Sequence, residues 1–557
     1  MNSELVFILS LFALSLSISL VLVPFSSRIA RLVGVIDRPC PRKIHKDAIP
    51  RMGGLAIACA VLLTLLGMAR DKPVVVAFCL GAAIVAFTGL LDDKFRLSVR
   101  LKLGGQILAA VAFMLTAQMS LSGLGNLFGL GNVGLGTLSP VVTVFCMAGV
   151  MNAFNLSDGL DGLAGGLGAI ACLFLAAFAY EHQVWHLVYI AVVLFGALLG
   201  FLRYNIHPAK LFMGDTGSLL VGYGVAVLAV GLVEGSAGGV RPASPVTPAL
   251  LLALPIADTI WVMCRRILKA CSPFQPDKTH LHHRLMGLGL GHSSTVTIIY
   301  TLMVFFSTAS WLSRGQPDWL RFHGGVLSLV LLYGTMAVLE ARQVNLDGFI
   351  GRFRLTYRIR SDNQSFRPTL REQLMSGGGI LLGVLCALPV FFLGNVSSLA
   401  ALFSWSAALI ICLYYPWAGQ RQQMVLAHGL FYAAAVLLLY VYFQQDWPRW
   451  PWYSIGVLAA LFILFTIRSR PDPILQLTSF DFLLLSFTWI LSLILAPLLG
   501  MSFDKQLNLI ASCALAVPLL CMMKMTARRS ISRNRLIAVG FVVVFLLIGL
   551  RRCVFFM

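Results

Sequence analysis

The feature that most limits what this chain can fold into is a long succession of apolar runs, separated by short polar segments. A run of about 20 apolar residues crosses the hydrocarbon core of a bilayer as a helix, which satisfies every backbone polar group internally. Of the residues in the chain, 59% are hydrophobic and only 11% are charged, which excludes an ordinary soluble domain. We therefore predict an all-α polytopic membrane protein.

The runs predict about eleven transmembrane helices in the first 341 residues and about seven more in a C-terminal extension. The spans predicted in the first part are 4–23, 52–69, 74–91, 102–120, 139–154, 163–180, 186–202, 216–233, 247–264, 294–312 and 323–340. We expect three parts: a catalytic membrane domain over 1–341, an Arg-rich cytoplasmic linker over 342–376 and a transmembrane extension of unknown function over 377–557. The first run follows Glu4 and has no small-residue cleavage site, so we expect a retained helix and not a signal peptide.

The net charge of +20 comes from basic residues that gather between spans. This distribution is typical of cytoplasmic loops and of anionic membrane ligands, and it argues against nucleic acid as a partner. The basic segment between the first two spans is expected in the cytoplasm, and alternation then places every acidic motif on the same side. Carboxylates on one membrane surface favour a catalytic site over a transport path, which usually has its carboxylates near the midplane. The 12 cysteines form no Cys-x-x-Cys motif and are expected to be packing residues.

Adjacent carboxylates end the third span in the segment DDKFRLSVRLK. Asp92 and Asp93 precede Arg100 and Lys102 at the head of the next span, a pattern that suits a phosphate and its magnesium ion. A solvated charged turn is the alternative.

Two more motifs carry aspartates beside amides or hydroxyls. In NAFNLSDGLDGLAGG, Asp158 and Asp161 are three residues apart, which places them on one face if the following helix begins early; a plain glycine turn is the alternative. In FMGDTGS, Asp215 lies at the start of the eighth span, where free backbone N–H groups favour phosphate oxygens and the carboxylate favours a metal ion. A simple helix N-cap explains Asp215 equally well.

A histidine-rich loop, SPFQPDKTHLHHRLM, contains His280, His282 and His283 among basic residues. Zinc is one interpretation, but no Cys or Glu accompanies the imidazoles at ligand spacing. Binding of a substrate phosphate fits better, and a solvated basic loop is the alternative. The segment GLGNVG matches a dinucleotide fingerprint by letters only, since it follows no strand, and we reject it.

Together these motifs resemble the polyprenyl-phosphate N-acetylhexosamine-1-phosphate transferases of glycosyltransferase family 4, over about residues 1–340. The segments that carry the resemblance are PRMGG, DDKFRLSVRLK, NAFNLSDGLDGLAGG, NIHPAKLFMGDTGS and SPFQPDKTHLHH, in this order. The His-x-His-His form, with Arg265 ahead of Ser272, is closer to the bacterial UDP-GlcNAc:undecaprenyl-phosphate branch than to the muramoyl-pentapeptide branch. The C-terminal extension departs from the family, so its function is not implied.

The resemblance implies a set of site residues. It implies catalytic roles for Asp92, Asp93, Asp158, Asp161, His280, His282 and His283, and a magnesium ion, replaceable by Mn²⁺, on Asp215 and Asn155. It implies that Gly159, Leu160, Asn205 and Phe212 line the nucleotide pocket. From the charge and position of the residues themselves we expect further substrate contacts from Lys46, Arg100, Lys102, Asn152 and Arg265.

The implied reaction transfers an N-acetylhexosamine-1-phosphate, foremost GlcNAc-1-phosphate, from a UDP-sugar to undecaprenyl phosphate and releases UMP. The product would initiate a lipid-linked envelope polysaccharide such as O-antigen, at the cytoplasmic face of the bacterial inner membrane. Three alternatives stay open: another UDP-N-acetyl sugar (FucNAc, QuiNAc or MurNAc-pentapeptide), a covalent route through Asp92, and a lipid-linked sugar flippase or polymerase. Expected partners are membrane lipids and, less directly, a second copy of the chain and downstream glycosyltransferases.

Overall fold

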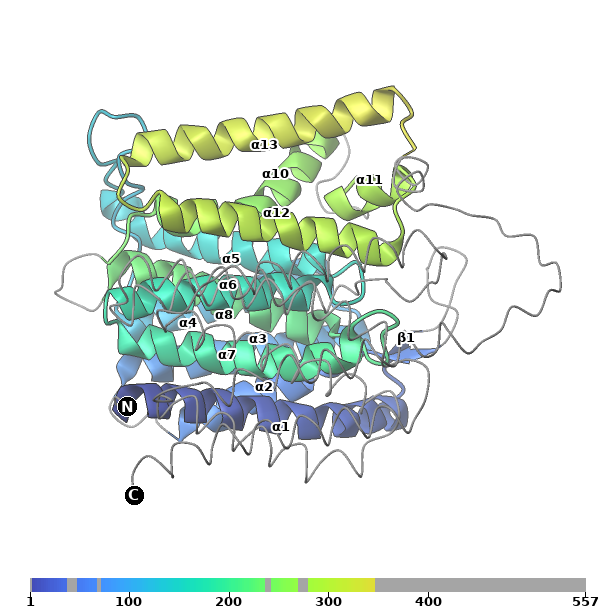
Figure 1. The fold of residues 1–557 in the computed structure, drawn as a ribbon. Helices are drawn as coiled ribbons and strands as arrows, with labels where there is room; N and C mark the ends of the chain where they lie inside the picture. The colour runs from blue at the N-terminus through green and yellow to red at the C-terminus, as the bar shows by residue number, and fades with distance from the viewer. Residues whose placement is uncertain (1–2, 38–47, 68–71, 236–241, 269–278, 346–557) are drawn as a thin grey trace, which may run out of the picture. The chain divides into compact units, whose positions relative to one another are not determined.

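The structure is a computed structural model that describes residues 3–37, 48–67, 72–235, 242–268 and 279–345. Its elements are α1 (Ser3–Val33), β1 (Ile36–Asp37), β2 (Ile49–Pro50), α2 (Gly53–Leu66), α3 (Pro73–Phe95), α4 (Val99–Ala117), the 3₁₀ turn η1 (Gly136–Leu138), α5 (Ser139–Ser157), α6 (Leu163–Glu181), α7 (Trp185–Asn205), α8 (Gly214–Glu234), α9 (Val246–Leu251), α10 (Ala253–Leu268), α11 (Leu281–Gly287), α12 (His292–Leu312) and α13 (Asp318–Ala341). The long helices lie side by side in one bundle (Figure 1).

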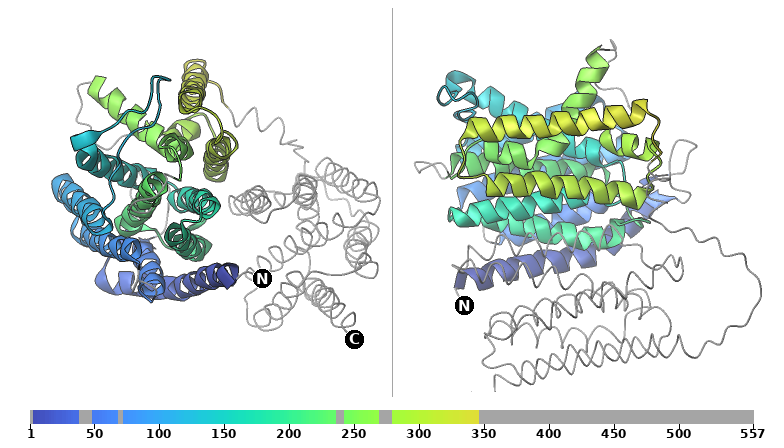
Figure 2. Two further views of the ribbon diagram at one scale, coloured as in Figure 1. Left: turned by 90° about the vertical axis from the view of Figure 1, so that its left-hand side faces the viewer. Right: turned by 45° about the horizontal axis from the view of Figure 1, so that its top comes forward.

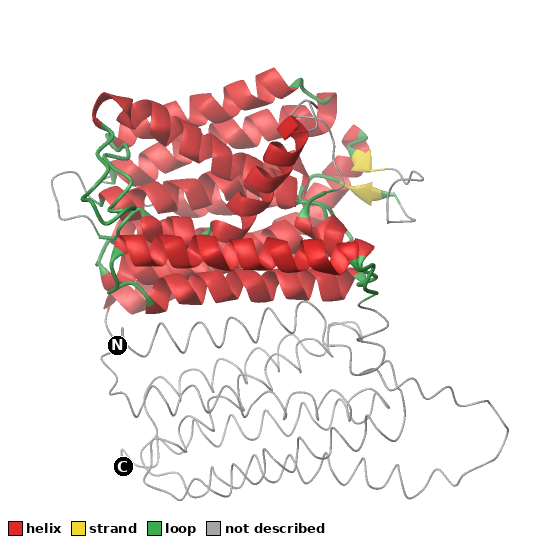
Figure 3. Cartoon of the chain, turned by 90° about the horizontal axis from the view of Figure 1, so that it is seen from above, coloured by secondary structure: helices red, strands yellow, loops and turns green. Residues whose placement is uncertain are grey.

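The two ends of the bundle differ. β1 and β2 form a short antiparallel pair, with Ile36 opposite Pro50. This pair lies at the right-hand end of Figure 1, and Figure 3 shows it in yellow beyond the helix ends. We call this end, where β1, β2 and α11 lie, the β1 end.

Nine helices in the described residues are long and apolar enough to cross a membrane. The prediction of a polytopic helical membrane protein is confirmed, while the count of spans differs from the expectation at two places. The predicted span 52–69 is the shorter helix α2, which has 14 residues. The predicted continuous span 247–264 is wrong, because the chain forms α9 and α10 with a break at Leu252. Pro255, in the first turn of α10, has no N–H to donate to Leu251, which favours a break in the helix at this place.

α8 occupies the centre of the bundle. It packs against α2, α3, α5, α6 and α7, and the end-on view in Figure 2 shows helices on all its sides. Its first turn is at the β1 end, where the Thr216 and Ser218 side chains are fully buried. The polar start of α8 is therefore surrounded by the ends of its neighbours.

The chain passes from α3 to α4 through a tight turn. α3 ends at Phe95, and the next residue, Arg96, adopts a left-handed conformation with φ 55°. Ser98 then caps α4, its Oγ accepting a hydrogen bond from the Leu101 N–H. This turn fixes the end of α3 beside the start of α4, so Asp92 at the end of α3 faces Lys102 of α4. The predicted linker and extension, 342–376 and 377–557, lie almost wholly outside the described residues, and α13 ends at Ala341.

Candidate active site

Aspartates from three separate segments meet at the β1 end. Asp92 and Asp93 come from the last turn of α3, Asp158 from the α5–α6 turn and Asp215 from the first turn of α8. Lys102 of α4 joins two of them: its Nζ lies 2.8 Å from Asp92 Oδ2 and 2.5 Å from Asp215 Oδ1. The predicted convergence of these motifs on one side is therefore seen.

Asp215 receives donors from two further segments as well. Asn155 Nδ2 donates to Asp215 Oδ1 over 2.6 Å and to Ser218 Oγ over 2.8 Å. Arg51 Nη2, from the segment between β2 and α2, donates to Asp215 Oδ2 over 3.3 Å. Burial opposes the charge on Arg51, but the surrounding carboxylates, Asp93 first, raise its pKa overall. Asp215 is thus a charged carboxylate at the centre of a cationic and amide environment.

Asp93, unlike Asp92, forms hydrogen bonds to the first turn of α8. Its Oδ1 accepts the Asp215 N–H at 2.9 Å, and its Oδ2 accepts the Thr216 N–H at 3.1 Å and the Thr216 hydroxyl at 2.7 Å. The side chain is only 1% exposed. Gly214 leaves room for this contact, since a Cβ there would lie 2.6 Å from Asp93 Oδ2. The N-cap of α8 is therefore supplied by α3, and not by Asp215 or by Thr216.

Asp92 faces the cationic side of the cluster. Its Oδ1 accepts the Leu97 N–H at 2.7 Å, which stabilises the α3–α4 turn, and its Oδ2 pairs with Lys102. Arg100 was also predicted to face the aspartates. Among the residues that the structure describes, Lys102 forms these ion pairs and Arg100 does not; the Arg100 side chain is exposed. The predicted role of Arg100, a contact with the lipid phosphate, stays a prediction.

Asp158 and Asp161 do not share a helical face, contrary to the prediction. α5 ends at Ser157 and α6 begins at Leu163, so both residues lie in the intervening turn. Burial and the neighbouring Asp215 raise the pKa of Asp158 to about 7. Burial also acts on Asp161, but hydrogen bonds from His207 and from the Ala209 N–H lower its pKa.

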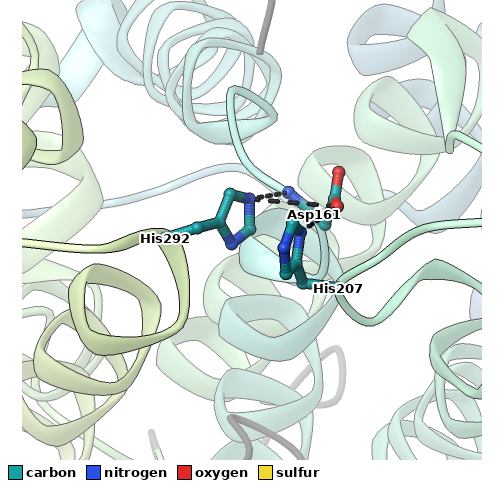
Figure 4. Close-up of side chains that lie close together, drawn as sticks. All are labelled: Asp161, His207 and His292. Carbon is teal, nitrogen blue, oxygen red and sulfur yellow. Dashed lines mark hydrogen bonds and ion pairs between the residues drawn. The ribbon is translucent and has the colours of Figure 1, made fainter. Parts of the chain in front are cut away.

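Asp161, His207 and His292 form a compact group from three loops (Figure 4). His207 Nδ1 lies 2.7 Å from Asp161 Oδ2, and the Asp161 N–H donates to His292 Nε2 over 3.1 Å. The two rings stack with centroids 4.1 Å apart and an angle of 22° between planes. An imidazole binds a metal in its ring plane, and one ion cannot lie in both of these nearly parallel planes unless a ring turns. In this arrangement the three side chains connect the α5–α6 turn, the α7–α8 loop and the start of α12 to one another.

Asn205 and Tyr300 also bind the α5–α6 turn, both through the backbone of Gly162. Asn205 Oδ1 accepts the Gly162 N–H at 2.9 Å, and its Nδ2 donates to the Leu211 carbonyl at 2.9 Å. The Tyr300 hydroxyl donates to the Gly162 carbonyl. Asn205 and Leu160 were both predicted to contact substrate. Both residues are buried in this structure, so they support the conformation of the α5–α6 turn from the interior of the protein.

The part of the histidine loop that the structure describes, from Thr279 on, places His282 against the α5–α6 turn. His282 Nε2 would lie 2.4 Å from a Cβ placed on Gly159, so only glycine leaves room for this ring. Burial, and next the adjacent His283, lower the pKa of His282 to about 3, which keeps it neutral. The described residues contain one cluster of three His or carboxylate ligands, the Asp161 group, so they give no support to zinc at the histidine loop.

The remaining predicted residues surround this centre. Asn152 Nδ2 donates to Gln106 Oε1 over 2.9 Å and ties α5 to α4. The backbone of Phe212 bonds to Pro50 and Gly53, which joins the α7–α8 loop to β2 and α2. Arg265 is half-buried in the last turn of α10, and Lys46 lies outside the described residues.

Four residues with contacts in this region were not among the predicted site residues: Arg51, His207, Asp258 and His292. Arg51 and His207 lie inside the segments PRMGG and NIHPAK, so proximity to those motifs was a usable signal. A histidine at a span start, as at His292, was another.

The fold and this cluster are those of a helical membrane protein with a part-buried group of charged side chains at the ends of its helices. The model of "Glycosyl transferase family 4" matches residues 75–233. The chain is 37% identical over 322 residues to a probable undecaprenyl-phosphate N-acetylglucosaminyl 1-phosphate transferase of Bacillus subtilis (strain 168), covering 58% of this chain and 88% of that protein. It is 30% identical to the undecaprenyl-phosphate alpha-N-acetylglucosaminyl 1-phosphate transferase of Yersinia pestis, covering 65% and 98% of the two chains. The Escherichia coli O157:H7 protein described by the same words is 31% identical over 56% of this chain and 85% of its own length.

The chain therefore belongs to glycosyl transferase family 4, and it is a multi-pass membrane sugar-phosphate transferase.

Proposed function

We propose that the protein transfers GlcNAc-1-phosphate from UDP-GlcNAc to undecaprenyl phosphate, releasing UMP, at a site on the β1 end that faces the cytoplasm. The observation that carries this proposal is the bridge of Lys102 between Asp92 and Asp215, inside a chain whose relatives bear this activity in their names. Functional carboxylates at helix ends, and not in mid-span, favour this reaction over the flippase or polymerase alternative.

The cluster has the composition of a magnesium site. Asp92, Asp93, Asp158 and Asp215 carry more negative charge than Lys102 and Arg51 neutralise, so the cluster attracts a further cation. Carboxylate and amide oxygens are the ligands Mg²⁺ prefers. Asp93 is a poorer ligand than Asp215, because both its oxygens already accept hydrogen bonds from the first turn of α8. Asp215, with Asn155 beside it, would hold the ion, which would supply charge neutralisation to the diphosphate of the sugar nucleotide.

The cationic side chains would position the two phosphate groups. Lys102 is part-buried between the Asp92 and Asp215 carboxylates and pairs with both. Its ammonium group could release one of these carboxylates and bind a lipid phosphate in its place. Arg51 approaches Asp215 from the opposite side, where the diphosphate would lie. Holding nucleophile and electrophile in line is the main source of rate in phosphoryl transfer.

A strong base is not required for this reaction. The second pKa of a phosphate monoester is about 6, so the lipid phosphate is largely dianionic at neutral pH and attacks the β-phosphorus directly. Asp92, tied to the Leu97 N–H and to Lys102, would orient the lysine and need not accept a proton. We therefore propose a single displacement, and no sugar-phosphoryl enzyme through Asp92.

The deciding experiment supplies the purified full-length protein with undecaprenyl phosphate and a panel of UDP-sugars. UMP release should require the lipid, should be fastest with UDP-GlcNAc, and should be absent in D215N. UMP release with none of the sugars would refute the proposed function. Exchange of labelled UMP into UDP-GlcNAc without lipid would refute the single displacement and favour the covalent route.

A further inference from the structure

Asp258 is a buried carboxylate that lies apart from the aspartate cluster. It lies on α10, and 8% of the residue is exposed. Its Oδ2 lies 2.9 Å from His280 Nδ1, its Oδ1 accepts the Leu281 N–H at 2.8 Å, and the Tyr333 hydroxyl lies 3.4 Å from Oδ1. A buried carboxylate is expensive unless each oxygen is paired, and both oxygens here are.

The two oxygens bind two different parts of the histidine loop. One meets the ring of His280, and the other meets the first N–H of α11, whose own N-cap residue makes no side-chain cap. Asp258 therefore sets the direction of α11 and the orientation of an imidazole together. A carboxylate at Nδ1 keeps the proton on that nitrogen and leaves the lone pair on Nε2.

A series of contacts runs from this pair to the aspartate cluster. The His280 ring stacks on His282 with centroids 5.8 Å apart and 8° between planes. His282 Nε2 lies against Gly159, directly next to Asp158. The position of α11 thus decides how closely His282 approaches the turn that carries Asp158.

We propose that Asp258 is a positioning residue of the transferase site, which fixes the Nδ1–H tautomer of His280 and seats the histidine loop against the α5–α6 turn. This inference rests on the proposed function, because the histidine loop matters to catalysis only if the diphosphate binds beside it. Asp258 itself touches neither phosphate nor lipid and acts through His280.

The test uses D258N, which preserves size and separates the two tasks of the carboxylate. The amide oxygen can still accept the Leu281 N–H, while its NH₂ donates to His280 Nδ1 and moves the ring proton to Nε2. We expect kcat to fall about 10- to 100-fold, as is typical when the residue behind a functional histidine is changed, with little change in KM for UDP-GlcNAc. Y333F, which removes the long third contact but keeps the carboxylate, is the matched control and should turn over like the wild type.

Two further measurements distinguish positioning from a merely structural role. In protein labelled with ¹⁵N-histidine, assigned by comparison with H280Q, the NMR shifts of His280 should report Nδ1–H in the wild type and Nε2–H in D258N. The double variant D258N/H280Q should be no slower than H280Q, since the carboxylate acts through the ring. Additive losses, a wild-type kcat in D258N, or an Nε2–H tautomer in the wild type would each overturn the inference.

The NMR result does not depend on turnover. If the wild type released no UMP, the proposed function would fail while the tautomer still tested the Asp258–His280 pair. If D258N did not fold, the tautomer of His280 in the wild type would decide the inference: Nδ1–H would support it and Nε2–H would overturn it.

Discussion

Replacing Asp93 by alanine would remove the acceptor for the first turn of α8. Two backbone N–H groups and one hydroxyl donate to this carboxylate, which is 1% exposed. A buried donor without a partner costs about 1–3 kcal/mol, so with three donors D93A should lose about 3–9 kcal/mol of unfolding free energy. The Thr216 hydroxyl can turn to a helix carbonyl, which favours the lower half of that range. D93N keeps one acceptor oxygen and should lose about half as much.

Unfolding of the purified protein in mixed micelles, followed by far-UV circular dichroism as SDS is increased, measures these differences. D215N is the matched control: it changes a neighbouring aspartate of the same cluster, which is 20% exposed and caps no helix. Its unfolding free energy should stay within about 1 kcal/mol of wild type, as for most partly solvated ion pairs, while UMP release is lost. Equal stability of D93A and wild type, or equal destabilisation of D93A and D215N, would refute the assignment of Asp93 to the fold.

Three further predictions follow from the same geometry. The pKa of Asp158 is about 7 in the folded chain against an ordinary value of 3.8. At a pH between these two values the native state therefore binds a proton at Asp158 that the unfolded state does not bind. The unfolding free energy should therefore fall as pH rises from about 4 to 7. Thermal unfolding scans should show this fall for the wild type and not for D158N, and an identical pH dependence of the two proteins would contradict the assignment to Asp158. Mn²⁺ titrations followed by electron paramagnetic resonance should show a site that D215N removes and D161N keeps; the reverse pattern would place the ion at the His207–His292 group. G159A would put a methyl group into the ring of His282, so turnover should fall about 100-fold, as for a 1 Å misplacement, and unchanged turnover would show that this contact is unimportant.

The gathering of charged motifs at one end of the bundle could be predicted from hydrophobicity alone. Alternating spans place the end of the third span and the start of the eighth on the same side, and Asp93 and Asp215 indeed meet there. What alternation cannot supply is the rotation of each helix about its own axis. Adjacent residues on a helix point about 100° apart, so sequence could not say that Asp93 faces α8 while Asp92 faces Lys102.

The two wrong predictions have local causes. Periodicity treats 247–264 as one apolar run, whereas the missing N–H of Pro255 favours the break between α9 and α10. That break matters for the site, because α10 carries Asp258 toward the histidine loop. Asp158 and Asp161 were expected on one helical face, but Gly162, with φ 82°, delays the start of α6. The catalytic roles expected of Asp158 and Asp161 stay predictions.

Close approach between helices explains why the aspartates meet at hydrogen-bonding distance at all. A Cβ on Gly89 of α3 would lie 2.3 Å from Thr216 Cα, and a Cβ on Gly54 of α2 would lie 2.1 Å from the Gly217 N. Both glycines let neighbouring backbones touch the first turn of α8, as small residues do in membrane helix packing. A methyl group at either position would force these backbones apart, and the 2.9 Å bond from the Asp215 N–H to Asp93 would be stretched or broken. The geometry of the charged cluster therefore depends on residues that carry no charge, which is why the motifs show the chemistry of the site but not the spacing of its atoms.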